Sequence, residues 1–238
     1  MAHRKTKVSS ASVKNFLRKL GADLVGITSV ENFDGALDKQ KPILYLSTAK
    51  SMISIGVRVP DSVLDNLPRT RRGYTATYDT VNAKLNDIAY RLAIFLEDNG
   101  YKTVYFPAGR PYNEDLILGD ISHRHVALKA GLGEIGYSGL LLTPRYGPRV
   151  RFNTVVTEAK LKLDLPYRGP KLCTHPDCIK CVEVCPPKAQ ASTKIEYLHP
   201  IGRVFDKQTC QRYMDDALKG LVCGMCVKVC PTGKKSHK

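Results

Sequence analysis

The residues of this 238-residue chain best suited to chemistry are its eight cysteines, which all lie between Cys173 and Cys230. The first motif is Cys173-x4-Cys178-x2-Cys181-x3-Cys185-Pro186, and the second is Cys210-x12-Cys223-x2-Cys226-x3-Cys230-Pro231. The signature C-x2-C-x3-C-P therefore occurs twice. This spacing is typical of cubane iron–sulfur centres, since two cysteines separated by two residues reach adjacent irons from one tight loop. We expect two [4Fe–4S] clusters, which exchange electrons one at a time.

Each cubane needs four thiolates, so the fourth ligand must come from elsewhere in the chain. In two-cluster ferredoxins the cysteine before the proline ligates the other cluster. Carried over to this sequence, one cluster takes Cys173, Cys178, Cys181 and Cys230, and the other takes Cys185, Cys210, Cys223 and Cys226. The alternative is a pair of zinc knuckles, but zinc sites have little use for a third cysteine three residues further on.

The composition predicts a soluble, cytoplasmic protein. A hydrophobic content of 43% is sufficient for a packed core. No apolar run reaches the roughly 18 residues that cross a bilayer, so no membrane association is expected. The basic start of the chain lacks the apolar core of a secretory signal. In the reducing cytoplasm, cysteines confined to one region are metal ligands more often than disulfides.

The formal net charge is +15. A [4Fe–4S]²⁺ core with four thiolates carries about −2, so two clusters leave a total of about +11. This balance favours anionic partners: a nucleic acid, an acidic electron donor or a phosphate-bearing cofactor. General solubility is the plainer interpretation.

Helical and strand patterns alternate ahead of the cysteines. Helices are predicted over residues 10–20, 78–99 and 122–130, the last capped by Ser122 and closed by Gly131, and strands over 23–28, 51–59, 102–106 and 150–157, with a polar loop over 61–73. This order favours an α+β fold. We expect a large domain over residues 1–165 and a cysteine module over 166–238.

A glycine-rich stretch, Gly131–Gly136, matches G-x-G-x-x-G by letters but follows a helix, which is the wrong context for a dinucleotide site. It is either a turn that brings backbone near a bulky ligand or a simple connection. Asp120, Tyr137 and Tyr146 are near it in sequence, and they are candidates for proton delivery or for structural roles.

Several segments resemble a known family. Leu20–Ile27 and Ala49–Val57 look like the opening of the cobalamin-dependent reductases. The stretch from Ala130 to Gly136 and on through Leu142–Arg151 resembles reductive dehalogenases and, less closely, epoxyqueuosine reductases. The order of that stretch, a Thr-Glu strand end and two ferredoxin motifs is also theirs.

The resemblance implies a nitroreductase-like domain that binds base-off cobalamin without a protein histidine on cobalt, followed by a ferredoxin-like module. The clusters would reduce the cobalt, with electrons from a ferredoxin or flavodoxin. The residues implied for the corrinoid are His123, Arg124, His125, Gly131, Leu132, Gly133, Gly136, Ser138, Gly139 and Leu140, and those implied for the proton are Asp120, Tyr137 and Tyr146. The sequence lacks the D-x-H-x-x-G pattern of corrinoid proteins that ligate cobalt by histidine.

Neither reductive dehalogenation nor epoxyqueuosine reduction can be assigned to this chain from the resemblance alone. We expect neither the C-terminal region by which epoxyqueuosine reductases help bind tRNA nor the twin-arginine signal of exported dehalogenases. The leading hypothesis is a corrinoid-dependent reductase of a small-molecule or nucleoside substrate. The alternatives are an electron carrier or reductive activator of another corrinoid protein, and a flavin enzyme on the same kind of fold. A tRNA substrate is a further alternative, in which phosphates would be contacted by the basic run Arg69–Arg72 and the tail lysines Lys234, Lys235 and Lys238.

Overall fold

A computed structural model describes residues 6–33, 40–109, 117–191 and 205–234. These residues form two compact units. The first unit is built from the described parts of 1–57, 82–132 and 151–167, and the second from those of 58–81, 133–150 and 168–238. One change of unit falls between Tyr167 and Arg168, while others fall earlier in the chain. The predicted linear division at residue 165 therefore stays a prediction.

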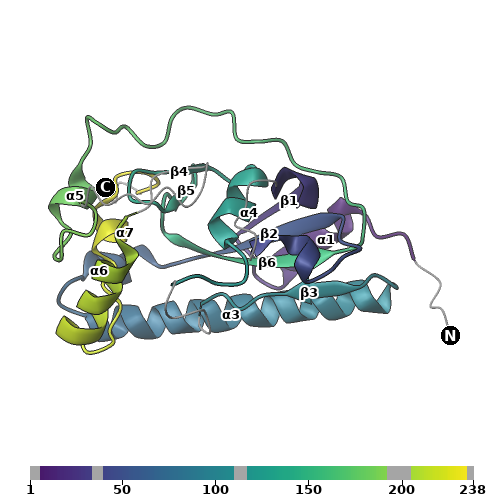
Figure 1. The fold of residues 1–238 in the computed structure, drawn as a ribbon, viewed down its shortest axis with the longest axis horizontal. Helices are drawn as coiled ribbons and strands as arrows, with labels where there is room; N and C mark the ends of the chain where they lie inside the picture. Colours follow the sequence, from purple (N-terminus) through teal and green to yellow (C-terminus); the bar gives the residue numbers. More distant parts are fainter. Residues whose placement is uncertain (1–5, 34–39, 110–116, 192–204, 235–238) are drawn as a thin grey trace. The chain divides into compact units, whose positions relative to one another are not determined.

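The first unit is organised around a four-stranded sheet with the order β1-β2-β6-β3 (Figure 1). The strands are β1 (Leu24–Ser29), β2 (Ser51–Arg58), β3 (Thr103–Tyr105) and β6 (Val150–Thr157). β1 pairs antiparallel with β2, and β3 pairs antiparallel with β6. β2 and β6 are buried along almost their whole length, as expected for the two central strands.

The first unit also contains three helices, which are α1 (Ser10–Lys19), most of α3 (Arg71–Asp98) and α4 (His123–Lys129). α1 begins with a capping box between Ser9 and Ser12. It packs on α3 through stacked rings of Phe16 and Phe95, 4.6 Å apart. The core around α4 contains buried Met52, Phe106, Ile121, Val126 and Val156, among others. Residues 71–81 of α3 belong to the second unit and 82–98 to the first.

The second unit carries short elements and all eight cysteines. Its elements are α2 (Asp61–Asp65), the hairpin β4 (Glu134–Ile135) and β5 (Leu141–Leu142), α5 (Lys180–Glu183), α6 (Lys207–Arg212), the π-helical turn η4 (Tyr213–Ala217) and α7 (Met225–Val229). Val59, Leu64, Leu67 and Tyr74 form its core, against which residues around α7 pack. The 3₁₀ turns η1 (Val30–Phe33) and η3 (Pro42–Leu44) lie in the first unit.

The structure confirms a mixed arrangement of helices and strands, and every predicted helix and strand is found. Their bounds agree within two residues except at the start of α3, which begins seven residues before the predicted residue 78. The predicted polar loop over 61–73 is wrong, because α2 occupies residues 61–65 and α3 begins at Arg71. Apolar Val63, Leu64 and Leu67 explain this difference, since they pack into the core of the second unit. Within the described residues, no helix has the length and apolar character needed to cross a membrane.

Candidate functional site

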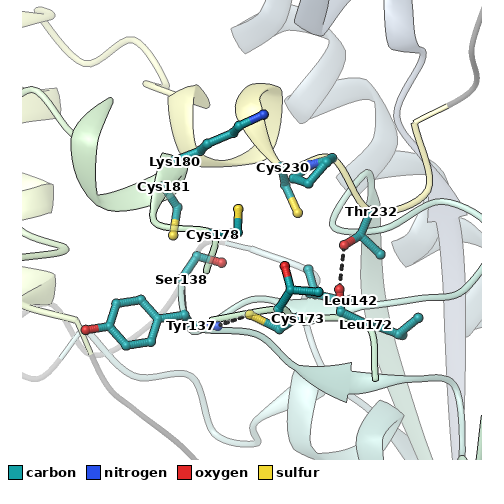
Figure 2. Close-up of a pocket in the computed structure, with 12 residues that line it drawn as sticks. Tyr137, Ser138, Leu142, Leu172, Cys173, Cys178, Lys180, Cys181, Cys230 and Thr232 are labelled. Carbon is teal, nitrogen blue, oxygen red and sulfur yellow. Dashed lines mark hydrogen bonds between the residues drawn. The ribbon is translucent and has the colours of Figure 1, made fainter. Parts of the chain in front are cut away.

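Four of the cysteines line one pocket of the second unit (Figure 2). Cys173, Cys178, Cys181 and Cys230 border it together with Ser138 and others, and the pocket holds about 390 Å³ of space counting its open mouth. Three of these thiols come from the first motif and Cys230 comes from the second. The structure therefore brings together the set predicted for one crossed cluster, here called thiol set I.

The glycine-rich segment holds the first thiol of set I in place. The Glu134 carboxylate accepts backbone N–H bonds from Leu172 at 2.7 Å and Cys173 at 2.6 Å. The backbone N–H of Tyr137 donates to Cys173 Sγ at 3.3 Å. Hydrogen bonds to sulfur are among the factors that set the reduction potential of iron–sulfur clusters. Ser138, one of the residues predicted for the corrinoid, also lines this pocket, and its contact with a corrinoid stays a prediction.

The remaining four thiols, here called thiol set II, also gather in one place. Burial raises the pKa of Cys210 to about 12, and the thiols of Cys223 and Cys185 add to the rise. Burial likewise raises the pKa of Cys226 to about 12, with contributions from Cys210, Cys223 and Cys185. Cys181 of set I contributes as well, so the two sets adjoin.

The donor sets fit iron–sulfur clusters. Thiolates packed this closely repel one another, and a cationic metal core both removes the repulsion and favours the deprotonated sulfur. Set I surrounds an open pocket with four sulfurs, which suits ligation at the corners of a cubane. In the described part of the chain, no three His, Cys, Asp or Glu side chains are grouped closely enough to hold a lone metal ion. Cluster ligation by the eight cysteines stays a prediction.

Among the predicted corrinoid residues, His123 is tied into the first unit. Its Nε2 lies 2.9 Å from the Pro107 carbonyl oxygen and its Nδ1 lies 2.9 Å from Thr154 Oγ1. Because a carbonyl only accepts, Nε2 carries the proton and Nδ1 accepts from the hydroxyl. Burial lowers the pKa of His123 to about 4; the Pro107 bond opposes this fall and Arg151 adds to it. The His123 ring is thus neutral with both nitrogens engaged, and its contact with a corrinoid stays a prediction.

The neighbouring residues of α4 are also engaged within the chain. The buried His125 ring places Nδ1 2.6 Å from Ser122 Oγ. Ser122 is the N-cap residue of α4, as predicted, but its side chain makes no capping hydrogen bond. Burial lowers the pKa of the Arg124 guanidinium. Contacts of His125 and Arg124 with a corrinoid stay predictions.

The glycines after α4 are required by the backbone of the chain itself. A Cβ on Gly131 would lie 2.0 Å from the Leu165 carbonyl oxygen, and one on Gly133 would lie 1.9 Å from that of Leu142. Leu132 follows Gly131 in the first unit. Gly136, Ser138, Gly139 and Leu140 lie in the turn between β4 and β5, where Gly136 N–H donates to Leu140 O and Gly139 N–H donates to Gly136 O, both at 2.9 Å. The close backbone contacts of Gly131 and Gly133 therefore explain why these two positions are glycine, without any bound ligand.

The three candidate proton donors have different surroundings. Asp120, in the first unit, accepts a hydrogen bond from Tyr45; burial raises the pKa of Tyr45, and the Asp120 carboxylate raises it further. Tyr137, in the second unit, stacks on His175 with ring centroids 3.6 Å apart. Tyr146 follows β5 in the second unit. Their role in proton delivery stays a prediction.

Sequence reasoning missed three charged residues that contact the cysteine loops: Glu134, Arg71 and Arg149. Arg71, part of the basic run considered for phosphate contacts, donates to the carbonyl oxygen of Cys223 at 2.8 Å. Lys234 lies 3.7 Å from Asp65, while Lys235 and Lys238 fall outside the described residues. No local pattern marks these roles, since the partners are far apart in the sequence.

Comparison with known proteins agrees with the resemblance. The chain is 29% identical over 174 residues to a tetrachloroethene reductive dehalogenase of Desulfitobacterium hafniense, covering 67% of this chain and 29% of that protein. It is 27% identical over 271 residues to an epoxyqueuosine reductase of Lactococcus garvieae strain Lg2, covering 94% of this chain and 70% of that protein. The chain is therefore related to reductive dehalogenases and to epoxyqueuosine reductases. No family model matches the sequence.

Solved structures of both kinds of relative share the fold. A reductive dehalogenase structure described as suggesting a mechanism for B12-dependent dehalogenation has a TM-score of 0.74 at 21% identity, covering 94% of this chain and 32% of that one. An epoxyqueuosine reductase structure has a TM-score of 0.64 at 22% identity, covering 94% and 65%. The chain thus spans about a third of these two dehalogenases and about two thirds of these two epoxyqueuosine reductases.

Proposed function

We propose that the protein is a corrinoid-dependent reductase in which two [4Fe–4S] clusters deliver electrons to a base-off cobalamin. The observation that carries the proposal is the gathering of Cys173, Cys178 and Cys181 of the first motif with Cys230 of the second around one pocket. Such a crossed set is typical of two-cluster ferredoxin modules. The relatives named as reductases support the reductive direction.

The chain's own residues would hold and insulate the redox centres. Clusters bound by sets I and II supply one-electron transfer, and a corrinoid supplies a cobalt centre that acts on the substrate. Glu134 and the N–H of Tyr137 fix Cys173 against its pocket. A nitroreductase-like domain ahead of a ferredoxin-like module is the fold assignment that accompanies this proposal.

Asp120 is the proposed proton donor of the first unit. Its carboxylate is held by Tyr45, and that hydroxyl can return a proton to it along the same hydrogen bond. Tyr137 and Tyr146 are the corresponding candidates of the second unit. The proposed substrate is a small molecule, by analogy with the reductive dehalogenases, or a nucleoside, by analogy with the epoxyqueuosine reductases. A tRNA substrate would follow from the second analogy.

The electron donor is proposed to be an acidic ferredoxin or flavodoxin. The formal charge of +15 favours such a partner by complementarity. Association should then slow as salt increases, since screening shortens the reach of the charges.

Anaerobic purification, followed by incubation with cobalamin and gel filtration, tests the proposal. We expect about eight iron atoms per chain and a corrinoid spectrum that co-elutes with the protein. Cluster absorbance without corrinoid uptake would reject the corrinoid role, and electron delivery to a second corrinoid protein would then identify a reductive activator. A flavin spectrum would identify the flavin alternative, and stoichiometric zinc would reject the clusters.

A further inference from the structure

The second unit contains a fully buried arginine, Arg149, whose role the sequence did not predict. Arg149 is 2% exposed, and its guanidinium is surrounded by backbone carbonyls of the last cysteine loop. It donates to Cys230 O at 2.8 Å, to Thr232 O at 2.9 Å and to Lys228 O at 3.3 Å. One side chain therefore ties down the residues on both sides of a predicted cluster ligand.

These contacts do two structural jobs. Lys228 is in the last turn of α7, whose final carbonyls have no partner inside the helix, so the guanidinium caps that end. The backbone beside Arg149 also packs directly on the same loop, because a Cβ on Gly147 (φ +53°) would lie 1.9 Å from Thr232 O. The thiol of Cys230 is thus presented to the pocket of set I from a loop fixed at several points.

The guanidinium also brings a buried positive charge to this loop, and Asp61 balances it. Arg149 Nε lies 3.3 Å from Asp61 Oδ1, and the Asp61 side chain is 23% exposed. A positive charge near an iron–sulfur cluster favours the reduced form, which is more negative, and a carboxylate favours the oxidised form. The two members of the pair therefore act on a neighbouring cluster with opposite sign.

An arginine also donates to the backbone of thiol set II, but it makes fewer contacts and is less buried. Arg71, at the start of α3, donates to Cys223 O at 2.8 Å and is only half-buried. Next to it in the sequence, Arg72 is exposed. Each set thus has one arginine, from outside the cysteine motifs, on the carbonyl of one of its cysteines.

We propose that Arg149 is a positioning residue for the cluster of thiol set I, and that the Arg149–Asp61 pair sets the reduction potential of that cluster. The inference rests on the iron–sulfur part of the proposed function and is independent of the corrinoid. It assigns Arg71 the same role, with a smaller effect, toward set II.

The test is a potentiometric titration of the full chain with reconstituted clusters, followed by electron paramagnetic resonance. Arg149→Met should move one of the two couples to lower potential, and Asp61→Asn should move the same couple to higher potential. Arg149→Lys keeps the charge but not the fork of donors. It should hold the potential near wild type while iron is released faster to a chelator.

Arg71→Met should shift the other couple, and Arg72→Met is the matched control that should shift neither. If Arg149→Met does not fold, the double variant with Asp61→Asn removes both charges, and Asp61→Asn alone still tests the sign. Equal shifts in both couples, or shifts of the same sign for Arg149→Met and Asp61→Asn, would overturn the inference. So would an unchanged potential in both variants. Absence of clusters in the wild-type protein would instead overturn the proposed function.

Discussion

The two compact units both fix a loop with side chains from distant elements, but they use different chemistry. In the first unit, the backbone at Pro107 and Ala108 is held mainly by neutral groups. Ala108 N–H donates to Asn86 Oδ1 at 2.8 Å, and the Pro107 carbonyl accepts from the His123 ring at 2.9 Å. Arg151 adds one charged donor, to Ala108 O at 3.1 Å.

In the second unit the same task falls to charged groups. Arg149, Arg71 and Glu134 bind the backbones of Cys230, Cys223 and Cys173 at 2.8, 2.8 and 2.6 Å. Charges placed against predicted cluster ligands act on electrons as well as on structure. The neutral network of the first unit instead couples structure to pH through His123. The comparison therefore predicts redox effects for variants of the second unit and pH effects for the first.

The largest effect is expected from serine substitutions of the cysteines. Cys230→Ser and Cys173→Ser should each lose about four of eight iron atoms and should leave the same remaining cluster, because both belong to set I. Cys223→Ser should leave the other one. Iron analysis and paramagnetic resonance of each variant check this. A Cys230→Ser spectrum matching that of Cys223→Ser would show that the ligands are not crossed.

Glu134→Ala comes next. It leaves the N–H groups of Leu172 and Cys173 without their acceptor, at a cost of about 1–3 kcal/mol in the free energy of unfolding. Glu134→Gln keeps an oxygen acceptor, so the free energy of unfolding should fall by less than in Glu134→Ala. Urea unfolding and iron release to a chelator measure both effects. Asp216→Ala removes an exposed carboxylate of the same unit as a control, and an equal loss there would argue against the specific contact.

The last prediction concerns pH and the first unit, and its effect vanishes at neutral pH. With a pKa near 4 in the folded protein, His123 stays neutral where the unfolded chain, with a pKa near 6.5, takes up a proton. The contribution of neutral His123 to the free energy of unfolding is therefore fully present above pH 6.5 and is lost as the pH falls toward 4. At pH 5 the loss is about 2 kcal/mol relative to pH 7.5. Urea unfolding of wild type and His123→Gln at both pH values checks it, and an equal pH dependence in the two would contradict it.

The sequence predicted what depends on local pattern. Hydrophobic periodicity found α1, α4 and the four strands of the large sheet, and cysteine spacing predicted which thiols gather. The start of α3 was missed because residues 61–73 look polar when read locally. Only the tertiary core reveals why Leu64 and Leu67 are buried.

The supports of the site were not predictable in the same way. Arg149 and Cys230 are 81 residues apart, and no periodicity relates a buried guanidinium to a carbonyl at that separation. The glycine-rich segment allows two interpretations from sequence alone, because its letters do not tell whether a ligand or the chain's own backbone requires a glycine. For Gly133 the close neighbour is the Leu142 carbonyl.

The most direct test of the account is anaerobic reduction of the protein loaded with clusters and cobalamin. The cobalt absorbance is followed after a low-potential donor is added, in wild type and in Cys230→Ser. We predict that cobalamin co-elutes with both proteins and is reduced rapidly only in the wild type, where thiol set I is complete. Equal reduction rates in the two proteins, or no retained cobalamin in the wild type, would contradict delivery of electrons from the clusters to a corrinoid.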